Sequence, residues 1–230
     1  VAASRLGLNT HIFEPSANPP AGQMTQRVTM ASYDDVEALR AFAQSVDVIT
    51  YEFENIPTSA LDILEDIRPI QPGRQALAVS QDRLAEKEFL TGLGLKVAPY
   101  ADVTNGEQAQ AAAARIGAPS ILKTRRMGYD GKGQMRLKQA SDMPAAWEAM
   151  AGAASVLEGF IDFSHEVSVI AARASDGQVA CYDPGENVHQ HGILHTTTVP
   201  ANLTTSQRMD AVLIAAKILN ALDYVGVMGV

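Results

Sequence analysis

The chain has 230 residues, of which 47% are apolar and 19% are charged. This length exceeds the ~100–200 residues of an ordinary domain, so we expect two domains. Its 18 Lys and Arg against 26 Asp and Glu residues give a formal net charge of −8, which excludes a general electrostatic attraction to nucleic acid or to an anionic membrane. Cys181 is the single cysteine, and no stretch approaches the ~20 apolar residues of a membrane span, so we expect a cytoplasmic protein.

The first part of the chain alternates strand-like and helix-like segments, which is typical of parallel α/β layers. The expected elements are a helix tail that Gly7 ends, strands at 10–13, 27–30 and 46–51, a helix capped by Ser32 and Asp35, and a helix that Pro57 begins. Residues 69–72 close this layer. We therefore expect a doubly wound α/β domain over residues 1–80.

From Ser80 onward the pattern changes to a smaller α+β arrangement. The expected elements are a helix at 82–91, a strand near 97–100, a helix capped by Thr104 and Glu107, strands at 119–124 and 133–137, and a helix at 144–150. They predict a lid over about residues 97–157. Strands at 166–174 and 178–182 flank Asp176-Gly177, a strong hairpin signal, within a partial central domain at 158–230.

Neither end of the sequence looks like the end of a fold. The first residues read as the tail of a helix, and residues 224–230 read as a buried strand with nothing after it to cover it. We therefore expect an internal fragment that lacks the first strand of its N-terminal domain and its C-terminal part. Such a fragment is expected to bind nucleotide weakly and not to turn over.

The chemistry concentrates in a glycine-rich segment between two expected strands. Gly128, Gly131 and Gly133 allow backbone N–H groups to approach phosphate oxygens, while Lys123 and Lys132 supply positive charge. The segment differs from the P-loop G-x-x-x-x-G-K-[ST], because no Ser or Thr follows the lysine. A glycine-rich hairpin with solvated lysines is the alternative interpretation of this segment taken alone.

Two acids further along the chain favour a nucleotide site. Glu158 ends an expected strand, and a short connector with free backbone N–H and C=O groups after it can bind ribose hydroxyls and an adenine edge. Glu166 begins the next strand and can serve the other hydroxyl. Taken singly, each is better explained as an exposed edge acid, since Glu is seldom buried. Together with the basic segment upstream, they favour binding of a nucleotide.

These residues resemble the ATP-grasp enzymes and, within them, the 5-(carboxyamino)imidazole ribonucleotide synthase family of purine biosynthesis. The matching segments are Tyr51-Glu-Phe-Glu-Asn55, Gln81-Asp-Arg83 with Lys87, residues 123–134, Glu158-Gly-Phe-Ile161 with Glu166, and Glu186-Asn-Val-His189 followed by Gly192-Ile-Leu194. The most specific piece is Tyr-Asp-Gly-Lys-Gly-Gln at 129–134, whereas Met127 departs from the glycine usual there. The resemblance implies an ATP-grasp fold, with a pre-ATP-grasp domain at 1–80 and an ATP-grasp region at 81–230.

The resemblance also implies roles for individual residues. ATP is expected to contact Arg83, Lys123, Gly128, Tyr129, Asp130, Gly131, Lys132, Gly133, Gln134, Glu158, Gly159, Phe160, Ile161, Glu166 and His189. Arg83 and Lys123 would bind phosphates, under the glycine loop (residues 128–134), and residues 158–161 would hold adenine and ribose. The ribonucleotide substrate is expected to contact Glu52, Glu54, Tyr129, Asp130 and Lys132, with Asp130 and Lys132 as catalytic residues. Alternating acids at 52 and 54 can also simply point into water.

The implied activity is that of an ADP-forming ligase that makes a carbon–nitrogen bond. ATP and bicarbonate would give carboxyphosphate and ADP, and the carboxyl group would pass to the exocyclic amine of aminoimidazole ribonucleotide. Phosphoryl transfer asks mainly for positioning and charge neutralisation, which a basic clamp with magnesium provides. We expect the magnesium-binding acids beyond Val230, and enzymes of this kind resemble homodimers.

Several alternatives stay open from the sequence. One is another ATP-grasp carboxylase or ribonucleotide ligase, such as a biotin carboxylase-like or formate-dependent glycinamide ribonucleotide enzyme. Others are a nucleotide-binding module without turnover and a dinucleotide-dependent oxidoreductase, against which the lack of a G-x-G-x-x-G motif counts. His189, His191 and His195 suggest either a zinc site or, preferably, a polar sheet face. Cys181 is expected to be a small buried residue, and Trp147 to belong to the core.

Overall fold

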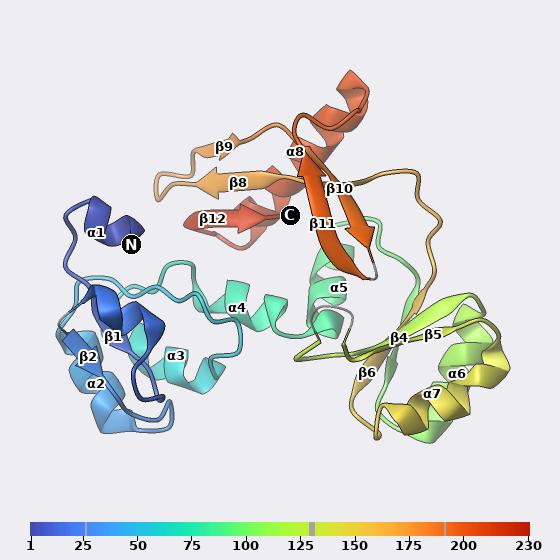
Figure 1. Cartoon of the computed structure of the whole chain (residues 1–230), viewed down its shortest axis with the longest axis horizontal. Coiled ribbons are helices and arrows are strands. Elements are labelled where there is room, and N and C mark those ends of the chain that lie inside the picture. Colours follow the sequence, from blue (N-terminus) through green and yellow to red (C-terminus); the bar gives the residue numbers. More distant parts are fainter. Residues whose placement is uncertain (26, 129–131, 191) are drawn as a thin grey trace. The chain divides into compact units, whose positions relative to one another are not determined.

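The computed structural model describes residues 1–25, 27–128, 132–190 and 192–230. The chain divides into two compact units, Val1–Leu77 and Ala78–Val230, which we describe one at a time. Figure 1 labels their helices and strands in chain order. Within the described residues, no helix is long and apolar enough to cross a membrane.

The first unit is built from helices around a small parallel pair of strands. Its elements are α1 (Ala2–Arg5), β1 (His11–Phe13), η1 (Pro20–Met24), β2 (Arg27–Thr29), α2 (Val36–Gln44) and α3 (Thr58–Glu65), and α4 (Arg74–Ser80) runs across the division between the units. β1 and β2 pair in parallel, as the doubly wound prediction requires. The buried core is formed by Leu39, Phe42, Ala43, Ile49, Ala60, Leu61, Leu64, Ile70 and Leu77.

The strand expected at 46–51 does not form. Ile49 makes an isolated parallel bridge with Ile70, closed by hydrogen bonds from Ile49 N to Pro69 O (2.9 Å) and from Gln71 N to Ile49 O (2.8 Å). Prolines lack the backbone N–H that extends a ladder, and Pro69 and Pro72 flank the bridge on one side. Only Ile49 of this run is buried, and the run does not become a regular strand.

The second unit contains a four-stranded antiparallel sheet in the order β3-β6-β4-β5. Its strands are β3 (Tyr100–Val103), β4 (Ser120–Thr124), β5 (Gln134–Leu137) and β6 (Ser155–Gly159), and its helices are α6 (Gly106–Ile116), η2 (Ala140–Asp142) and α7 (Met143–Ala149). α6 and α7 lie side by side against one face (Figure 1). They enclose a core of Ala101, Val103, Ala109, Ala112, Ala113, Leu122, Leu137, Met143, Ala146, Met150 and Leu157, with Trp147 packed against it as predicted.

Two local details of this lid differ from the sequence prediction. The strand expected near 97–100 begins at Tyr100, because Pro99 has no N–H and only its carbonyl joins the sheet, accepting from Gly159 N at 2.8 Å. The helix α6 is capped by Asn105, whose side chain accepts from Gln108 N, rather than by Thr104. Asn105 stands directly before the first helical residue, which is the position that a capping side chain must occupy.

Side chains alternate between the two faces of this sheet, so the strands also build a second face opposite α6 and α7. The register places Tyr100, Ile121 and Arg136 level with Glu158 across the four strands, and Lys123 lies two residues along from Ile121. A cation and an acid of the predicted site therefore share the face that α6 and α7 leave uncovered.

Helix α5 (Arg83–Gly92) precedes the lid. Asp82 caps it by accepting from Leu84 N and Ala85 N. The helix ends at Gly92, and Gly94 just after it has a left-handed conformation at φ +72. The helix predicted at 82–91 is confirmed to within one residue at each end.

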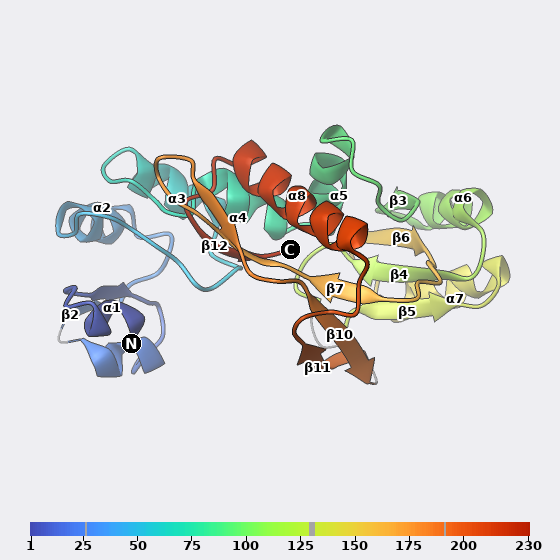
Figure 2. The same cartoon turned by 90° about the horizontal axis from the view of Figure 1, so that it is seen from above.

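Two further three-stranded sheets complete the second unit. One has the order β12-β8-β9, with β8 (Ile170–Arg173), β9 (Val179–Cys181) and β12 (Gly226–Gly229), and the other has the order β11-β10-β7, with β7 (Glu166–Ser168), β10 (Gly185–Gln190) and β11 (Ile193–Thr198). α8 (Thr205–Ala221) packs on β8 and β9. Figure 2 shows the β10–β11 hairpin beside β7.

The single strand expected at 166–174 is divided between these two sheets. Its first residues pair with β10, while Val169 exchanges backbone hydrogen bonds with Val230 (2.8 and 3.0 Å) and the following residues pair with β9 and β12. The turn predicted at Asp176-Gly177 is confirmed, with Gly177 at φ +85. One continuous strand-like sequence thus forms strands in two different sheets, because its two halves pair with different strands.

Candidate functional site

A cluster of three charged side chains lies on the second face of the lid sheet. Lys123 Nζ, from β4, is 3.0 Å from Glu158 Oε2, and Lys87 Nζ, from α5, is 3.3 Å from Glu158 Oε1. The exposed fractions of these side chains are 24% for Lys123, 14% for Lys87 and 12% for Glu158. The structure therefore brings together the predicted phosphate lysine and the predicted adenine–ribose acid, with one additional cation.

The neighbouring carboxyl of Glu86 experiences the same cluster. Its residue surface is exposed, yet enough protein surrounds the carboxyl that lost solvation raises its pKa, and the charge on Glu158 adds to the effect. Arg83, Lys87 and Lys123 oppose that rise. The overall direction is upward, so Glu86 holds its proton more strongly than an isolated glutamate does.

Arg83 forms hydrogen bonds with the end of β4 and with the first residue of the glycine loop. Its Nε donates to Thr124 O at 3.1 Å, and its Nη2 donates to Gly128 O at 2.9 Å. Its backbone N–H donates to Arg125 O at 2.9 Å. The residue predicted to bind phosphate thus also fixes the chain where the strand β4 passes into the loop.

The base of the loop is further tied to the start of α5 by an ion pair. Arg125 donates from Nε to both oxygens of Asp82 at 3.0 Å and from Nη2 to Oδ2 at 2.7 Å. Arg126 Nη2 donates to Gln81 Oε1 at 2.7 Å. Arg125 and Arg126 are therefore both engaged with the two residues that precede α5.

We predict that Arg125→Met lowers the free energy of unfolding by roughly 1–3 kcal/mol at neutral pH, as expected when a largely buried charged acceptor loses its donor. Burial pushes the pKa of Asp82 up, but the hydrogen bonds from Arg125, Leu84 and Ala85 together hold it below its ordinary value. The stability this gives is present above the ordinary pKa and is lost as pH falls through the lowered one.

The free energies of unfolding of the wild type and Arg125→Met, measured with denaturant, should therefore differ most at neutral pH. They should converge as the pH falls below the ordinary aspartate pKa of about 3.9. Arg208→Met is the matched control, because Arg208 lies 3.9 Å from Asp183 in an exposed pair, for which about 0–1 kcal/mol is expected. An equal loss in both variants, or a difference that does not depend on pH, would contradict the assignment.

The glycine loop is described only in part. Gly128 and the stretch from Lys132 to Gln134 are described, whereas Tyr129, Asp130 and Gly131 lie outside the described residues. Thr124 N donates to Gly133 O at 2.8 Å, and Gly133 has φ +65, which glycine adopts without steric cost. Lys132 is exposed at this end of the loop.

The connector after β6 corrects one expectation. Gly159 N donates to Pro99 O at 2.8 Å and Phe160 N donates to Pro119 O at 3.0 Å, so these two N–H groups are engaged within the lid. The Arg136 guanidinium lies over the Phe160 ring, 4.4 Å from its centroid. The expected free N–H groups at Gly159 and Phe160 are thus absent, because the connector continues the hydrogen bonding of the sheet.

Glu166 and His189 form a second pair of predicted nucleotide residues. Glu166 Oε1 lies 3.2 Å from His189 Nδ1, and the antiparallel strands β7 and β10 bring them together. His191 lies outside the described residues, and among those described we find no group of three or more His, Cys, Asp or Glu side chains arranged to hold a metal ion. Cys181 is half-buried.

Glu52 and Glu54 belong to the first unit. The strand end on which their alternation was predicted does not form, and both residues are exposed. The explanation is the interrupted pairing of Ile49 described above, which leaves residues 51–53 without regular structure. Which of the two acids faces a substrate stays a prediction.

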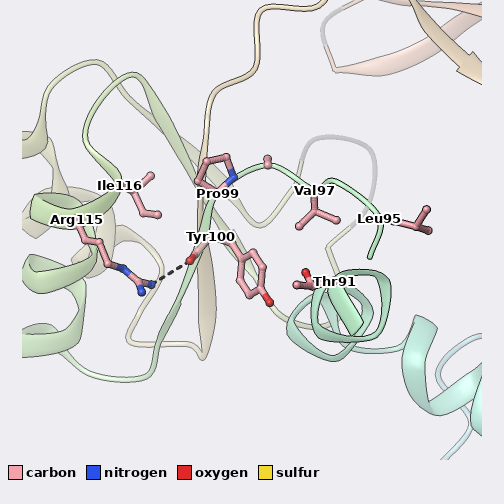
Figure 3. Close-up of a pocket in the computed structure, with 8 residues that line it drawn as sticks. Thr91, Leu95, Val97, Pro99, Tyr100, Arg115 and Ile116 are labelled. Atoms are coloured by element: carbon pink, nitrogen blue, oxygen red, sulfur yellow. Dashed lines mark hydrogen bonds between the residues drawn. The ribbon is translucent and has the colours of Figure 1, made fainter. Parts of the chain in front are cut away.

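An open groove of about 450 Å³ is lined by residues of α5, β3, α6 and the segment before β3. Figure 3 shows Tyr100 between Arg115, which donates to Tyr100 O at 3.0 Å, and Thr91 of α5. The remaining lining residues are Leu95, Val97, Ala98, Pro99 and Ile116. This lining is mainly apolar and contains none of the residues predicted to contact ATP.

Comparison with known families matches both units. Residues 88–230 match the ATP-grasp domain, and residues 1–81 match the ribonucleotide synthetase preATP-grasp domain. The chain belongs to the ATP-grasp family. The ATP-grasp fold predicted from the sequence is thereby confirmed.

Two relatives of this ATP-grasp chain carry the same name. N5-carboxyaminoimidazole ribonucleotide synthase from Brucella melitensis biotype 1 is 48% identical over 100% of the chain and 64% of its own length. The synthase of the same name from Pseudomonas aeruginosa is 36% identical over 99% of the chain and 62% of its own length. The chain thus spans less than two thirds of these relatives.

Solved structures agree with these relatives. The ADP complex of an N5-carboxyaminoimidazole ribonucleotide synthetase has a TM-score of 0.92 and 37% identity, over 99% of this chain and 60% of its own. The enzyme from Aspergillus clavatus, in complex with ADP and 5-aminoimidazole ribonucleotide, has a TM-score of 0.87 and 27% identity, over 99% of this chain and 60% of its own.

No role was predicted for Lys87 from the sequence, although Lys87 belongs to one of the segments that resemble the family. Lys87 lies four residues after Arg83 on α5, which puts both side chains on one face of the helix. That spacing was the available signal. The pairing of Lys87 with Glu158 required the tertiary structure, because 71 residues separate the two in sequence.

Proposed function

We propose that this chain is the nucleotide-binding part of an ADP-forming ligase that carboxylates aminoimidazole ribonucleotide with bicarbonate. One observation carries the proposal. The Lys87–Glu158–Lys123 cluster and the Arg83-anchored glycine loop lie together in a chain that matches synthases of that name along nearly its whole length. A cation cluster beside a glycine loop suits the binding of phosphates.

The residue roles in this proposal follow the sequence prediction. Lys123 and Arg83 bind ATP phosphates, and residues 128–134 close over them. Residues 158–161 hold adenine and ribose, partly through the side chain and carbonyl groups, since Gly159 and Phe160 use their N–H groups within the lid. Glu166 binds ribose, with His189 oriented beside it at 3.2 Å.

The ribonucleotide side of the site rests on the resemblance alone. Tyr129, Asp130 and Lys132 face the ribonucleotide and the carboxyl group, with Asp130 and Lys132 as the catalytic residues. Glu52 and Glu54 stay predicted contacts of the same substrate.

The proposed reaction has two steps. A bicarbonate oxygen attacks the γ-phosphorus of ATP and ADP leaves, which gives carboxyphosphate. The exocyclic amine of the ribonucleotide then attacks the carboxyl carbon, a C–N bond forms, the C–O bond to phosphate breaks, and the amine gives up a proton. Closure of the glycine loop excludes water, which would otherwise hydrolyse carboxyphosphate.

Magnesium is part of the proposal, but its ligands are not identified. Glu158 is paired with two lysines and Glu166 with His189, so neither is a ready carboxylate ligand for a hard cation. The residues described do not fit a magnesium site, and we derive no step through the ion. That its ligands lie beyond Val230, and that the enzyme is a homodimer, stay predictions.

The test measures ADP release by the chain extended at both ends to the length of its relatives. We predict that release becomes fast only when bicarbonate and aminoimidazole ribonucleotide are both present, because carboxyphosphate formation is productive only with its acceptor in place. Biotin with bicarbonate, and glycinamide ribonucleotide with formate, are the control pairs of co-substrates. Equal or faster ADP release with either pair would assign the chain to another ATP-grasp ligase.

A further inference from the structure

The charged cluster contains one more cation than its acid can neutralise. Each oxygen of Glu158 contacts one ammonium group, Oε1 that of Lys87 and Oε2 that of Lys123. Two lysines and one glutamate leave one positive charge in excess within this mostly buried group, beside which lie the guanidinium of Arg83 and the carboxyl of Glu86. This excess is available to attract an anion.

The arrangement poses a problem for Lys123 if that residue binds phosphate. To reach a phosphate oxygen, its ammonium must leave Glu158 or share it. A carboxylate exposed at only 12% would then lose a partner, and an unpaired charge with so little solvent is costly. Without a second cation, Glu158 would therefore compete with the nucleotide for Lys123.

Lys87 removes that competition. We propose that Lys87 is a positioning residue of the nucleotide site, which holds and neutralises Glu158 so that the Lys123 ammonium can turn to the phosphates of ATP. The proposal rests on the proposed function, because it takes Lys123 as the phosphate ligand. It adds a residue and a mechanism that the resemblance does not supply.

The surroundings of Lys87 suit a fixed partner better than a mobile one. Its side chain is 14% exposed, and its ammonium lies over the Tyr100 ring, 5.8 Å from the centroid. Tyr100 is in register with Glu158 on the adjacent strand. Lys123 is more exposed, at 24%, so it is the member of the pair with more access to a ligand.

The test compares nucleotides that differ in their phosphates, using calorimetric Kd values for ATP, ADP and adenosine with this chain. For Lys87→Met we expect Kd for ATP and ADP to rise about tenfold, near the lower end for losing a hydrogen bond with a charged partner. Kd for adenosine should change by less than about twofold, which is the size of effect expected from a surface substitution away from the ligand. Lys87→Arg, which keeps the charge, should retain most of the ATP affinity.

A second background separates positioning from direct contact. In Glu158→Gln the competing carboxylate is gone, so adding Lys87→Met should leave the ratio of the ATP and adenosine Kd values unchanged. If Lys87→Met weakened ATP binding relative to adenosine equally with and without the Glu158 carboxylate, Lys87 would contact phosphate itself. That result would overturn the proposal. Equal losses for ATP and adenosine would also overturn it, since they would indicate a structural role only.

Lys217→Met is the matched control, because it removes the same charge from an exposed position on α8. It should leave all three Kd values unchanged, and a rise in the ATP and ADP Kd values equal to that in Lys87→Met would mean that only the net charge of the chain matters, which would overturn the proposal. If the unsubstituted chain bound ATP no better than adenosine, Lys123 would not be a phosphate ligand and the proposed function would fail with the inference. ATP binding that survives Lys87→Met unchanged would overturn the inference alone.

Discussion

Replacing Lys123 by methionine is expected to lower kcat/KM for ATP by roughly 10²–10³-fold, the range found when one preorganised donor to a developing charge is removed. Lys123 is the penultimate residue of β4, and its side chain lies on the face of the sheet that α6 and α7 do not cover. Methionine keeps most of its length and apolar stem but supplies no charge to a phosphate. The measurement is steady-state kinetics with ATP as the varied substrate, on the chain extended to the length of its relatives.

The fold should survive this substitution. The lid core lies on the opposite face, and Glu158 retains Lys87 as its partner, so no charge is left unpaired. We expect the free energy of unfolding to change by about 1 kcal/mol or less. Lys138→Met, at an exposed position after β5, is the control and should leave the kinetics unchanged. Unaltered ATP kinetics in Lys123→Met would refute the assignment of phosphate binding.

The parts of the fold that local chemistry determines were predictable. Asp35 stands where a helix needs a side-chain acceptor, and it caps the helix predicted from it. Gly177 supplies the left-handed conformation of the predicted hairpin turn. Each of these signals lies within a few residues of the element it begins or ends, so no knowledge of the rest of the chain is required.

The parts that depend on strand partners were less predictable. The apolar run at 46–51 has the composition of a strand, but its partner segment contains Pro69 and Pro72 and offers only one bridge. The run at 166–174 is continuous in sequence, yet Val169 pairs with Val230 and divides it between two sheets. A strand exists only where another segment completes its hydrogen bonds, and that segment is not visible from the strand's own residues.

The site shows the same division. Lys123 with Glu158, and Glu166 with His189, were predicted to serve one nucleotide, and each pair lies within 3.2 Å in the structure. The ion pairs that hold the cluster and the loop in place could not be predicted, because Asp82 and Arg125 are 43 residues apart. Motifs identify the residues that meet a ligand, whereas the residues that orient them are found only when the chain is folded.

Gly133 is the position where the loop itself can be tested. It has φ +65, and a Cβ added there would lie 2.6 Å from Thr124 Oγ1, on the residue whose N–H bonds to Gly133 O. Alanine at Gly133 therefore adds both the strain of a left-handed residue, about 1–2 kcal/mol, and an overlap that moves the loop from β4. Gly94 separates the two effects, because it has φ +72 but nothing within 4 Å of an added Cβ.

We expect Gly133→Ala to lower kcat/KM for ATP by roughly 10²-fold, since a displacement of about 1 Å in a positioning element can cost that much. Gly94→Ala should lose similar stability from backbone strain while its ATP kinetics stay near those of the wild type. Thermal unfolding of both variants, measured beside their kinetics, gives the comparison. Because the strain is common to the two glycines and the contact with Thr124 is not, a loss of activity confined to Gly133→Ala would come from displacement of the loop. An equal loss in both variants, or none in either, would mean that the packing of Gly133 against Thr124 does not position the loop for ATP.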